Sequence, residues 1–130
     1  MKKLAFISIL FLASCNSNSK KQAQGEVATG TVSCNSLPSS FASYDAAVSA
    51  VESADFEFTD NANTSKSSWI RAARFYSCNN ADGYFIIETD KGNYLHQGVP
   101  ITVWESFKAA DSFGSFYNAN IKHQYRLVLN

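Results

Sequence analysis

His96 is the residue of this sequence best suited to acid–base chemistry, because imidazole titrates near neutral pH. It follows Tyr94 at the end of an expected strand. A histidine that acts as a general base needs an acid to orient it and a nucleophile to deprotonate, and Glu105 and Ser112 are the nearest candidates along the chain. The sequence therefore offers a small hydrolase using His96 as a distant hypothesis. The plainer interpretation is a hydrogen-bonded or surface histidine.

Large aromatic side chains gather in the same part of the chain and have the flat faces needed to line a ligand pocket. They are Tyr94, Trp104, Phe107, Phe116 and Tyr117. Helical spacing relates several of them, however, and an aromatic stripe of this kind is more typical of a core. Both interpretations stay open, so Tyr94, His96, Trp104 and Tyr117 are candidate ligand-binding residues. Trp104 is also expected to face a sheet, near Tyr94 or Phe107.

Residues 92–125 must position these side chains. A short strand is expected from Tyr94, with Gly98 breaking it. Pro100 suits the first position of a helix, where its missing N–H costs nothing, and it forces Val99 into an extended conformation. A first helical stripe then runs to about residue 111 through Val103, Trp104, Phe107 and Ala110, and a second runs through Phe113, Phe116, Tyr117 and Ile121. The pattern predicts a strand, a rigid corner and two helices.

The preceding residues predict one more helix and most of a sheet. Residues 38–54 carry a helical stripe that Ser43 can cap, and residues 55–59 alternate like a half-buried strand before a polar loop over 60–68. Further strands are expected at 69–77, 84–89, 94–97 and 125–129, with a hairpin turn at 90–93. The predicted fold class is α+β: a small antiparallel sheet with one helix before it and two helices after it.

The first fifteen residues have the features of a targeting signal. Two lysines precede an apolar run from Leu4 to Leu12, which is shorter than the roughly 20 residues that span a bilayer. Leu12-Ala13-Ser14-Cys15 resembles the lipobox of bacterial lipoproteins, which implies cleavage before Cys15 and attachment of palmitate-like acyl chains to its thiol. An ordinary secretory signal with a chance cysteine is the alternative. We expect a signal peptide at 1–14, a flexible polar tether at 15–33 and a single domain at 34–130.

Two cysteines remain if Cys15 carries lipid, namely Cys34 and Cys78. Disulfides persist outside the cytoplasm, so a Cys34–Cys78 bridge is expected, with two unpaired thiols as the alternative. A closed loop of about 45 residues contributes about 4 kcal/mol in the chain-entropy model. The cysteines form no CxxC pair and have no histidine near them, so the sequence predicts no metal site, and it indicates no cofactor.

Charge is unevenly distributed along the expected domain. The stretch from Cys34 to Thr64 carries acids but no Lys or Arg, whereas the rest carries a slight excess of basic residues. Nucleic-acid binders usually carry a much larger excess, so we expect the two halves to complement each other. A nucleic-acid interface outside the cytoplasm is the alternative function, and its candidate residues are Arg71, Arg74, Lys122 and Arg126.

A family resemblance emerges from residues 67–126. Its carriers are Ser67-Ser68-Trp69-Ile70, Gly92-Asn93-Tyr94, Val99-Pro100, Ala110 to Asn118 and Ile121 to Tyr125. Together they resemble the KTSC domain, a module found at the C-terminus of some lysyl-tRNA synthetases and as a stand-alone bacterial protein. The family carries Tyr-x-Tyr where this chain has Tyr94-Leu95-His96. The synthetase context implies RNA binding, but a lipid-anchored protein outside the cytoplasm does not meet tRNA.

These observations favour a bacterial envelope protein that is anchored by lipid on Cys15 and carries a KTSC-like binding or interaction module. The expected partners are the membrane and an unidentified envelope protein or ligand. No phosphate loop, paired-carboxylate motif or Ser-His-Asp signature stands out, so the sequence favours binding over catalysis.

Overall fold

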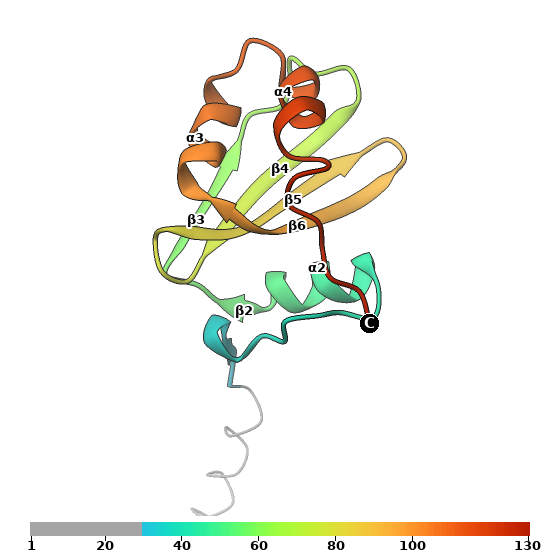
Figure 1. Cartoon of the computed structure of the whole chain (residues 1–130). Helices are drawn as coiled ribbons and strands as arrows, with labels where there is room; N and C mark the ends of the chain where they lie inside the picture. Colours follow the sequence, from blue (N-terminus) through green and yellow to red (C-terminus); the bar gives the residue numbers. More distant parts are fainter. Residues whose placement is uncertain (1–29) are drawn as a thin grey trace, which may run out of the picture. The chain divides into compact units, whose positions relative to one another are not determined.

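The computed structural model describes residues 30–130, and an antiparallel sheet with strand order β3-β4-β5-β6 lies at its centre (Figure 1). The strands are β3 (Phe58–Ala62), β4 (Ile70–Ser77), β5 (Asp82–Thr89) and β6 (Gly92–Pro100). One helix, α2 (Tyr44–Glu52), precedes the sheet, and α3 (Ile101–Ala109) and α4 (Phe113–Asn120) follow it. The predicted α+β class is confirmed.

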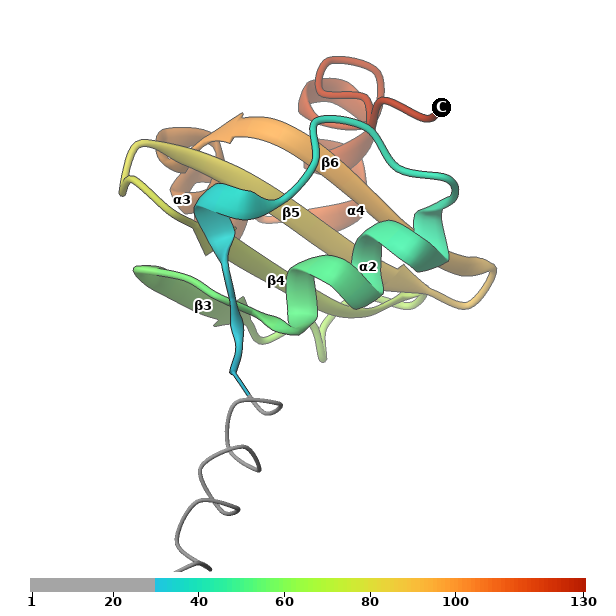
Figure 2. The same cartoon turned by 90° about the horizontal axis from the view of Figure 1, so that it is seen from below.

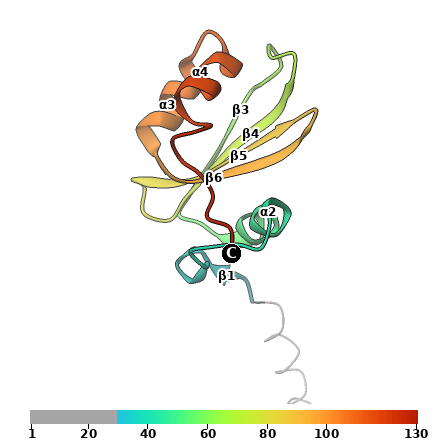
Figure 3. The ribbon, with the colours of Figure 1, turned by 45° about the vertical axis from the view of Figure 1, so that its right-hand side comes forward.

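Helices cover both faces of the sheet, because successive side chains of a strand point to opposite faces. In β5, Phe85 and Ile87 pack with residues of α3 and α4, whereas Ile86 packs with residues of α2. Figure 2 shows α2 lying across the strands, and Figure 3 shows α3 and α4 on the opposite side of the sheet. This arrangement explains the continuous apolar run in β5, which is buried on both faces.

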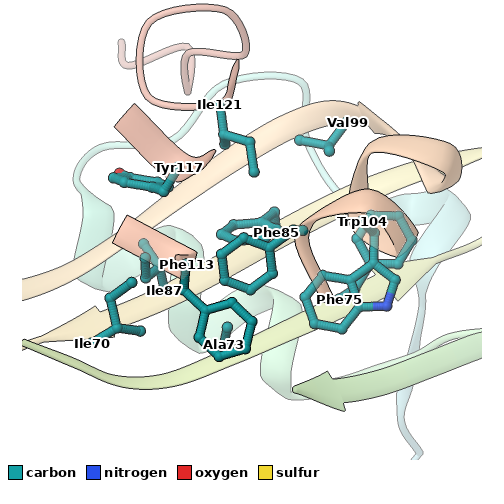
Figure 4. Packing of buried hydrophobic residues seen from close by; sticks show 11 residues of the cluster. Ile70, Ala73, Phe75, Phe85, Ile87, Val99, Trp104, Phe113, Tyr117 and Ile121 are labelled. Atoms are coloured by element: carbon teal, nitrogen blue, oxygen red, sulfur yellow. The ribbon is translucent and has the colours of Figure 1, made fainter. Parts of the chain in front are cut away.

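Aromatic rings fill the layer between the sheet and α3 (Figure 4). Trp104 is 0% exposed and stacks on Phe75 with ring centroids 5.5 Å apart. It also contacts Phe85 and Phe107, with centroid distances of 5.6 Å and 5.8 Å. The indole Nε1 donates a hydrogen bond of 2.9 Å to Asp60 Oδ2. The prediction that Trp104 faces the sheet near Phe107 is therefore confirmed.

The end of β6 differs from the expectation that Gly98 breaks the strand. Gly98 has a φ of +70°, yet β6 continues through Val99 to Pro100. Glycine adopts this φ without a Cβ penalty, so the strand deforms rather than stops. Pro100 is the N-cap of α3 and Ile101 is its first helical residue, so the helix begins one residue later than predicted. The direct passage from extended Val99 into a helix is as expected.

Two other strand predictions are wrong in detail. The alternating stretch at 55–59 is divided between β2 (Ala54–Asp55) and β3, and β3 extends through residues expected to form a loop. Pairing explains the shift, since Asp60 lies opposite Phe75 and Ala62 opposite Ala73 in β4. The expected strand at 125–129 is reduced to one parallel bridge between Phe41 and Leu129.

The described chain begins with short elements tied to the rest of the domain. β1 (Val32–Ser33) pairs in parallel with β2, and the 3-10 helix η1 (Cys34–Ser36) follows it. Cys34 forms the predicted disulfide with Cys78 just after β4, with Cα atoms 5.9 Å apart. Helix α2 begins later than residue 38, because Ser43 caps it by accepting a hydrogen bond from Ala46 N. The predicted signal peptide and Cys15 lie outside the described residues.

Ion pairs join the acidic early part of the domain to the basic later part, as the charge distribution predicted. Arg74 in β4 lies 2.7 Å from Glu52 of α2 and 2.5 Å from Glu88 of β5. Asp60 of β3 accepts from Lys108 of α3 at 2.5 Å. These pairs fasten α2 and α3 to opposite faces of the sheet. Within residues 30–130, no helix has the length and apolarity to cross a membrane.

Candidate functional site

A cleft of about 840 Å³ lies beside the edge strand β6. It brings together residues from α2, the β5–β6 hairpin, α4 and the segment after α4. Its lining consists of Tyr44, Trp69, Thr89, Asp90, Lys91, Tyr94, His96, Tyr117, Asn118, Lys122, His123, Arg126 and Leu127. Among these are four of the predicted ligand-binding residues, Tyr94, His96, Tyr117 and Lys122.

Aromatic side chains form much of the cleft wall. Tyr44, the first residue of α2, meets Tyr94 edge to face with ring centroids 5.4 Å apart. Trp69, just before β4, meets Tyr117 of α4 in the same manner at 6.2 Å. A Cβ at Gly114 would lie 2.8 Å from Trp69 Nε1, so the absence of a side chain there lets α4 approach the indole. The four rings thus depend on contacts between elements far apart in sequence.

His96 is a buried member of the lining, only 4% exposed, and both of its ring nitrogens are hydrogen-bonded. Nδ1 lies 2.8 Å from the backbone oxygen of Tyr125, and Nε2 lies 2.8 Å from the hydroxyl of Tyr117. A carbonyl oxygen only accepts, so Nδ1 carries the proton of the neutral ring. Nε2 therefore accepts from Tyr117, and the imidazole joins α4 to the C-terminal segment.

Burial sets the protonation of this pair. It lowers the pKa of His96 below the usual 6.5, and the hydrogen bond to the Tyr125 carbonyl opposes this shift only in part. Burial also raises the pKa of the Tyr117 hydroxyl, and its neighbours Tyr44 and Tyr94 act in the same direction. Both groups are consequently neutral near pH 7, with the tyrosine as donor and the histidine as acceptor.

Cationic side chains surround the aromatic wall. Lys91 comes from the β5–β6 turn, and Lys122 and Arg126 come from the segment after α4. Asp90 is the carboxylate in the lining. Its Oδ2 lies 4.0 Å from Nη2 of Arg71, and both side chains are exposed. An exposed pair of this kind contributes little to stability. The cleft thus combines three cations, one carboxylate and neutral aromatic groups.

The remaining predicted site residues lie elsewhere. Trp104 belongs to the aromatic core, Arg74 pairs with Glu52 and Glu88, and Arg71 lines a smaller hollow of about 430 Å³ beside the loop that follows β3. The two partners considered for His96 are engaged separately: Ser112 caps α4, and Glu105 pairs with Lys108. Of the four residues considered for nucleic-acid binding, only Lys122 and Arg126 therefore line the cleft.

Several lining residues were not anticipated from the sequence. Tyr44 and Trp69 were assigned to a helical stripe and a strand start, and Lys91 to a hairpin turn. Nothing local marks Tyr44 as a neighbour of Tyr94, because their contact depends on how α2 crosses the sheet. The one available signal was the presence of Trp69 among residues that resemble the KTSC domain. In the region from residue 30 onward, no group of three His, Cys, Asp or Glu side chains could hold a metal ion.

Fold and cleft together define a small α+β domain with an aromatic and cationic cleft at its sheet edge. The family model of the KTSC domain matches residues 85–125, which run from β5 to the segment after α4. The chain is similar to a KTSC domain protein from Yersinia pestis of known crystal structure, with 24% identity and a TM-score of 0.45. That similarity covers 55% of this chain and 99% of the other. No curated protein matches the chain.

Proposed function

We propose that this protein is a lipid-anchored binding module of the bacterial cell envelope, outside the cytoplasm, and that its ligand occupies the cleft beside β6. The lipobox-like stretch ending at Cys15 supports the anchor. The disulfide between Cys34 and Cys78 is consistent with a compartment outside the cytoplasm, where such bonds persist. Residues matched by the KTSC model supply most of the cleft lining, while Tyr44 and Trp69 precede the matched part and Arg126 and Leu127 follow it.

The observation that carries the binding role is the convergence of Tyr94, His96, Tyr117 and Lys122 in one cleft. These residues come from β6, α4 and the following segment. Clefts with aromatic walls and a few polar groups are the usual form of ligand sites. The polar pair at this site is already satisfied internally, since Tyr117 donates to His96 and His96 donates to Tyr125.

That internal pairing favours binding over catalysis. A general base needs a free lone pair within reach of the proton it removes. In His96, Nε2 uses its lone pair to accept from Tyr117, and Nδ1 carries a proton. The imidazole therefore acts as a rigid strut between α4 and the C-terminal segment. Replacing it should change the shape of the cleft rather than remove a reactive group.

The anchor is tested by fractionation of cells that express the full chain. Cys15→Ala should move the protein from the membrane fraction to the fraction released from the envelope, because acyl chains on Cys15 provide the proposed attachment. Cys78→Ala serves as the matched cysteine control and should leave any folded protein with the membranes. Unchanged membrane association of Cys15→Ala would exclude the proposed anchor.

Ligand binding is tested by purifying the full chain from envelopes and identifying co-purifying small molecules by mass spectrometry. Lys122→Gln should lower the recovery of a ligand that occupies the cleft. Lys66→Gln removes the same charge outside the cleft, where Lys66 donates to the backbone oxygen of Ala110, and should leave recovery unchanged. Equal recovery from both variants would place the ligand outside the cleft.

Nucleic-acid binding is the second candidate, and the combination of Lys122 and Arg126 with aromatic rings favours it. Binding to phosphates releases counterions, so the affinity for a single-stranded oligonucleotide should fall steeply with salt, with a logarithmic slope of about −0.7 per phosphate contacted. An affinity for the envelope ligand that varies little with salt, together with no oligonucleotide binding at low salt, would favour the first function.

A further inference from the structure

The distribution of unpaired charge indicates what kind of ligand the cleft takes. In the described part of the chain, Arg71, Arg74 and Lys108 each lie within 4.0 Å of a carboxylate. Lys66 donates to the backbone oxygen of Ala110 and lies over the ring of Phe113. Three basic side chains of this region have no such protein partner, and all three line the cleft: Lys91, Lys122 and Arg126.

The balance of charge in the cleft therefore favours an anion. Three cations and one carboxylate, Asp90, give the Lys, Arg, Asp and Glu side chains of the lining a net charge of +2. A phosphate monoester carries about −1.5 to −2 charges near pH 7 and offers three acceptor oxygens. Arg126 can hold two of those oxygens at once, and a lysine can approach the third.

The aromatic wall indicates that the anion is joined to a ring. A site for free phosphate needs donors but no aromatic surface, whereas this lining contains the rings of Trp69 and Tyr94 as well as the cations. The hydroxyls of Tyr44 and Tyr94 make no hydrogen bond to any residue in 30–130, so they remain free to bond with polar groups on such a ring. The lining thus suits a ring that has a flat or apolar face and hydroxyl groups at its edge.

We propose that the cleft binds a phosphate monoester of a hydroxylated ring compound, a class that includes sugar phosphates and nucleoside monophosphates. The phosphate contacts Lys91, Lys122 and Arg126, and the ring lies against Tyr94 and Trp69. This assignment rests on the proposed binding function and specifies its ligand class.

The test is calorimetric titration of the full chain in detergent with five probes. Glucose 6-phosphate and AMP represent the two sources of this chemistry, glucose and adenosine are their uncharged counterparts, and inorganic phosphate represents the anion alone. We expect at least one phosphorylated probe to bind at least about tenfold more tightly than both its uncharged counterpart and inorganic phosphate, as a charged hydrogen bond typically provides. Preference for AMP or for glucose 6-phosphate identifies the source.

Variants locate the binding site. Lys122→Gln and Arg126→Gln should each weaken the bound probe by about tenfold, because each removes a contact to the phosphate. Lys66→Gln lowers the net charge by the same amount at a residue whose contacts, Ala110 and Phe113, lie outside the cleft lining, and it should change the affinity by less than about twofold because solvent screens an exposed charge that does not touch the ligand. If all three variants weaken probe binding equally, the effect comes from the overall charge of the protein and not from contacts in the cleft, and the proposal is overturned.

The remaining outcomes separate this assignment from the proposed function. Inorganic phosphate binding as tightly as both phosphorylated rings would overturn the ring requirement. If no probe binds but Lys122→Gln still lowers recovery of the envelope ligand, the ligand class is wrong and the binding function stands. If no probe binds and recovery is unchanged, both fail.

Discussion

Two regions of this small domain are rich in aromatic side chains, but one is a fully buried core and the other lines an open cleft. Beneath α3, Phe75, Phe85, Trp104 and Phe107 are all 0% exposed and pack directly on one another. Beside β6, Tyr44, Trp69, Tyr94 and Tyr117 surround a cleft. The first region is closed by ring-on-ring contact, whereas the second leaves space between its rings.

Polar atoms account for much of this difference. Three of the core rings are phenylalanines, and the one polar atom among the four rings, Trp104 Nε1, is satisfied by Asp60. Burial of such a group without a partner would be costly. The cleft rings include Tyr44 and Tyr94, whose hydroxyls have no partner within residues 30–130, and the lining also contains three cations without protein partners in that range. Groups of this kind favour contact with water or a ligand, so they keep the second region open.

The largest effect is expected from breaking the closed region. Trp104→Ala should lower the free energy of unfolding by about 3–5 kcal/mol, the usual cost of removing a large aromatic from a core. It also takes the indole donor from Asp60. Thermal melts measure the loss, and Trp104→Phe should recover much of it because the ring remains. A melting temperature of Trp104→Ala within a degree or two of wild type would mean that this region is not the core.

A smaller effect is expected where α4 meets the cleft wall. Gly114→Ala places a Cβ 2.8 Å from Nε1 and 2.9 Å from Cζ2 of Trp69, so the rigid indole must shift. Overpacking of this kind costs about 1–3 kcal/mol, offset in part by the better helix propensity of alanine, about 1 kcal/mol. Denaturant titration measures the net loss.

A second substitution, Trp69→Phe, tests whether the indole causes the cost of Gly114→Ala. Trp69→Phe has a smaller ring, so Gly114→Ala should cost less in that background than in wild type. Equal costs in both backgrounds would show that the indole is not what the new methyl group meets, and that α4 approaches the cleft for another reason.

A pH effect is expected from His96 in the cleft. Its pKa is lowered in the folded state, so below about pH 6.5 the unfolded chain binds a proton that the folded chain does not. Stability should therefore fall as the pH drops from 7.5 to 5.5, by at most about 1.4 kcal/mol per pH unit for one proton. His96→Gln should flatten this dependence in thermal melts, whereas exposed His123→Gln should keep it. The same slope in all three proteins would contradict the assignment.

Asp60 in the closed region titrates in a lower range and can be distinguished. Burial raises its pKa, but hydrogen bonds from Lys108 and Trp104 outweigh that effect, and the pKa is lowered overall. Its contribution is therefore present above the unfolded value of 3.8 and lost as the pH falls through the folded pKa. The open and closed regions should thus respond to acid in two separate pH ranges.

The smallest effect on stability is expected from Tyr94→Phe, which removes only a hydroxyl without a partner in residues 30–130. The free energy of unfolding should change by less than about 0.5 kcal/mol. Affinity for the phosphorylated probe that binds best should nevertheless fall, because the ring edge loses a polar contact. A variant with wild-type affinity would show that this hydroxyl does not reach the ligand.

Local signals predicted the regular parts of the fold. Ser43 marked the start of α2, its apolar stripe matched the buried Ala47, Val48 and Val51, and the strand expected at 84–89 corresponds to β5. The prediction that Gly98 ends its strand was wrong. A glycine in a strand can mark a stop, a bulge or a bend, and only the pairing of β6 with β5 shows which of these occurs.

The candidate site was only partly predictable. Tyr94, His96 and Tyr117 could be selected for their chemistry, but the same reasoning selected Trp104, which the apolar stripe of α3 carries into the core. Helical spacing does not distinguish a ring under the helix from one at its edge. Arg74 was likewise chosen for its charge, and its partner Glu52 lies on a separate helix that a local pattern cannot place against it.

The disulfide at the start of the domain has a consequence for proteolysis. A protease that cuts any single peptide bond between Cys34 and Cys78, for example in the 63–68 loop, leaves the two fragments covalently joined. With lipid on Cys15, such a cut would nick the chain without shedding the KTSC domain from the membrane. Release would require reduction of the bond or a cut outside the closed loop, either before Cys34 or in the exposed turn that follows Cys78, so those two places would decide how long the cleft stays attached to the anchor.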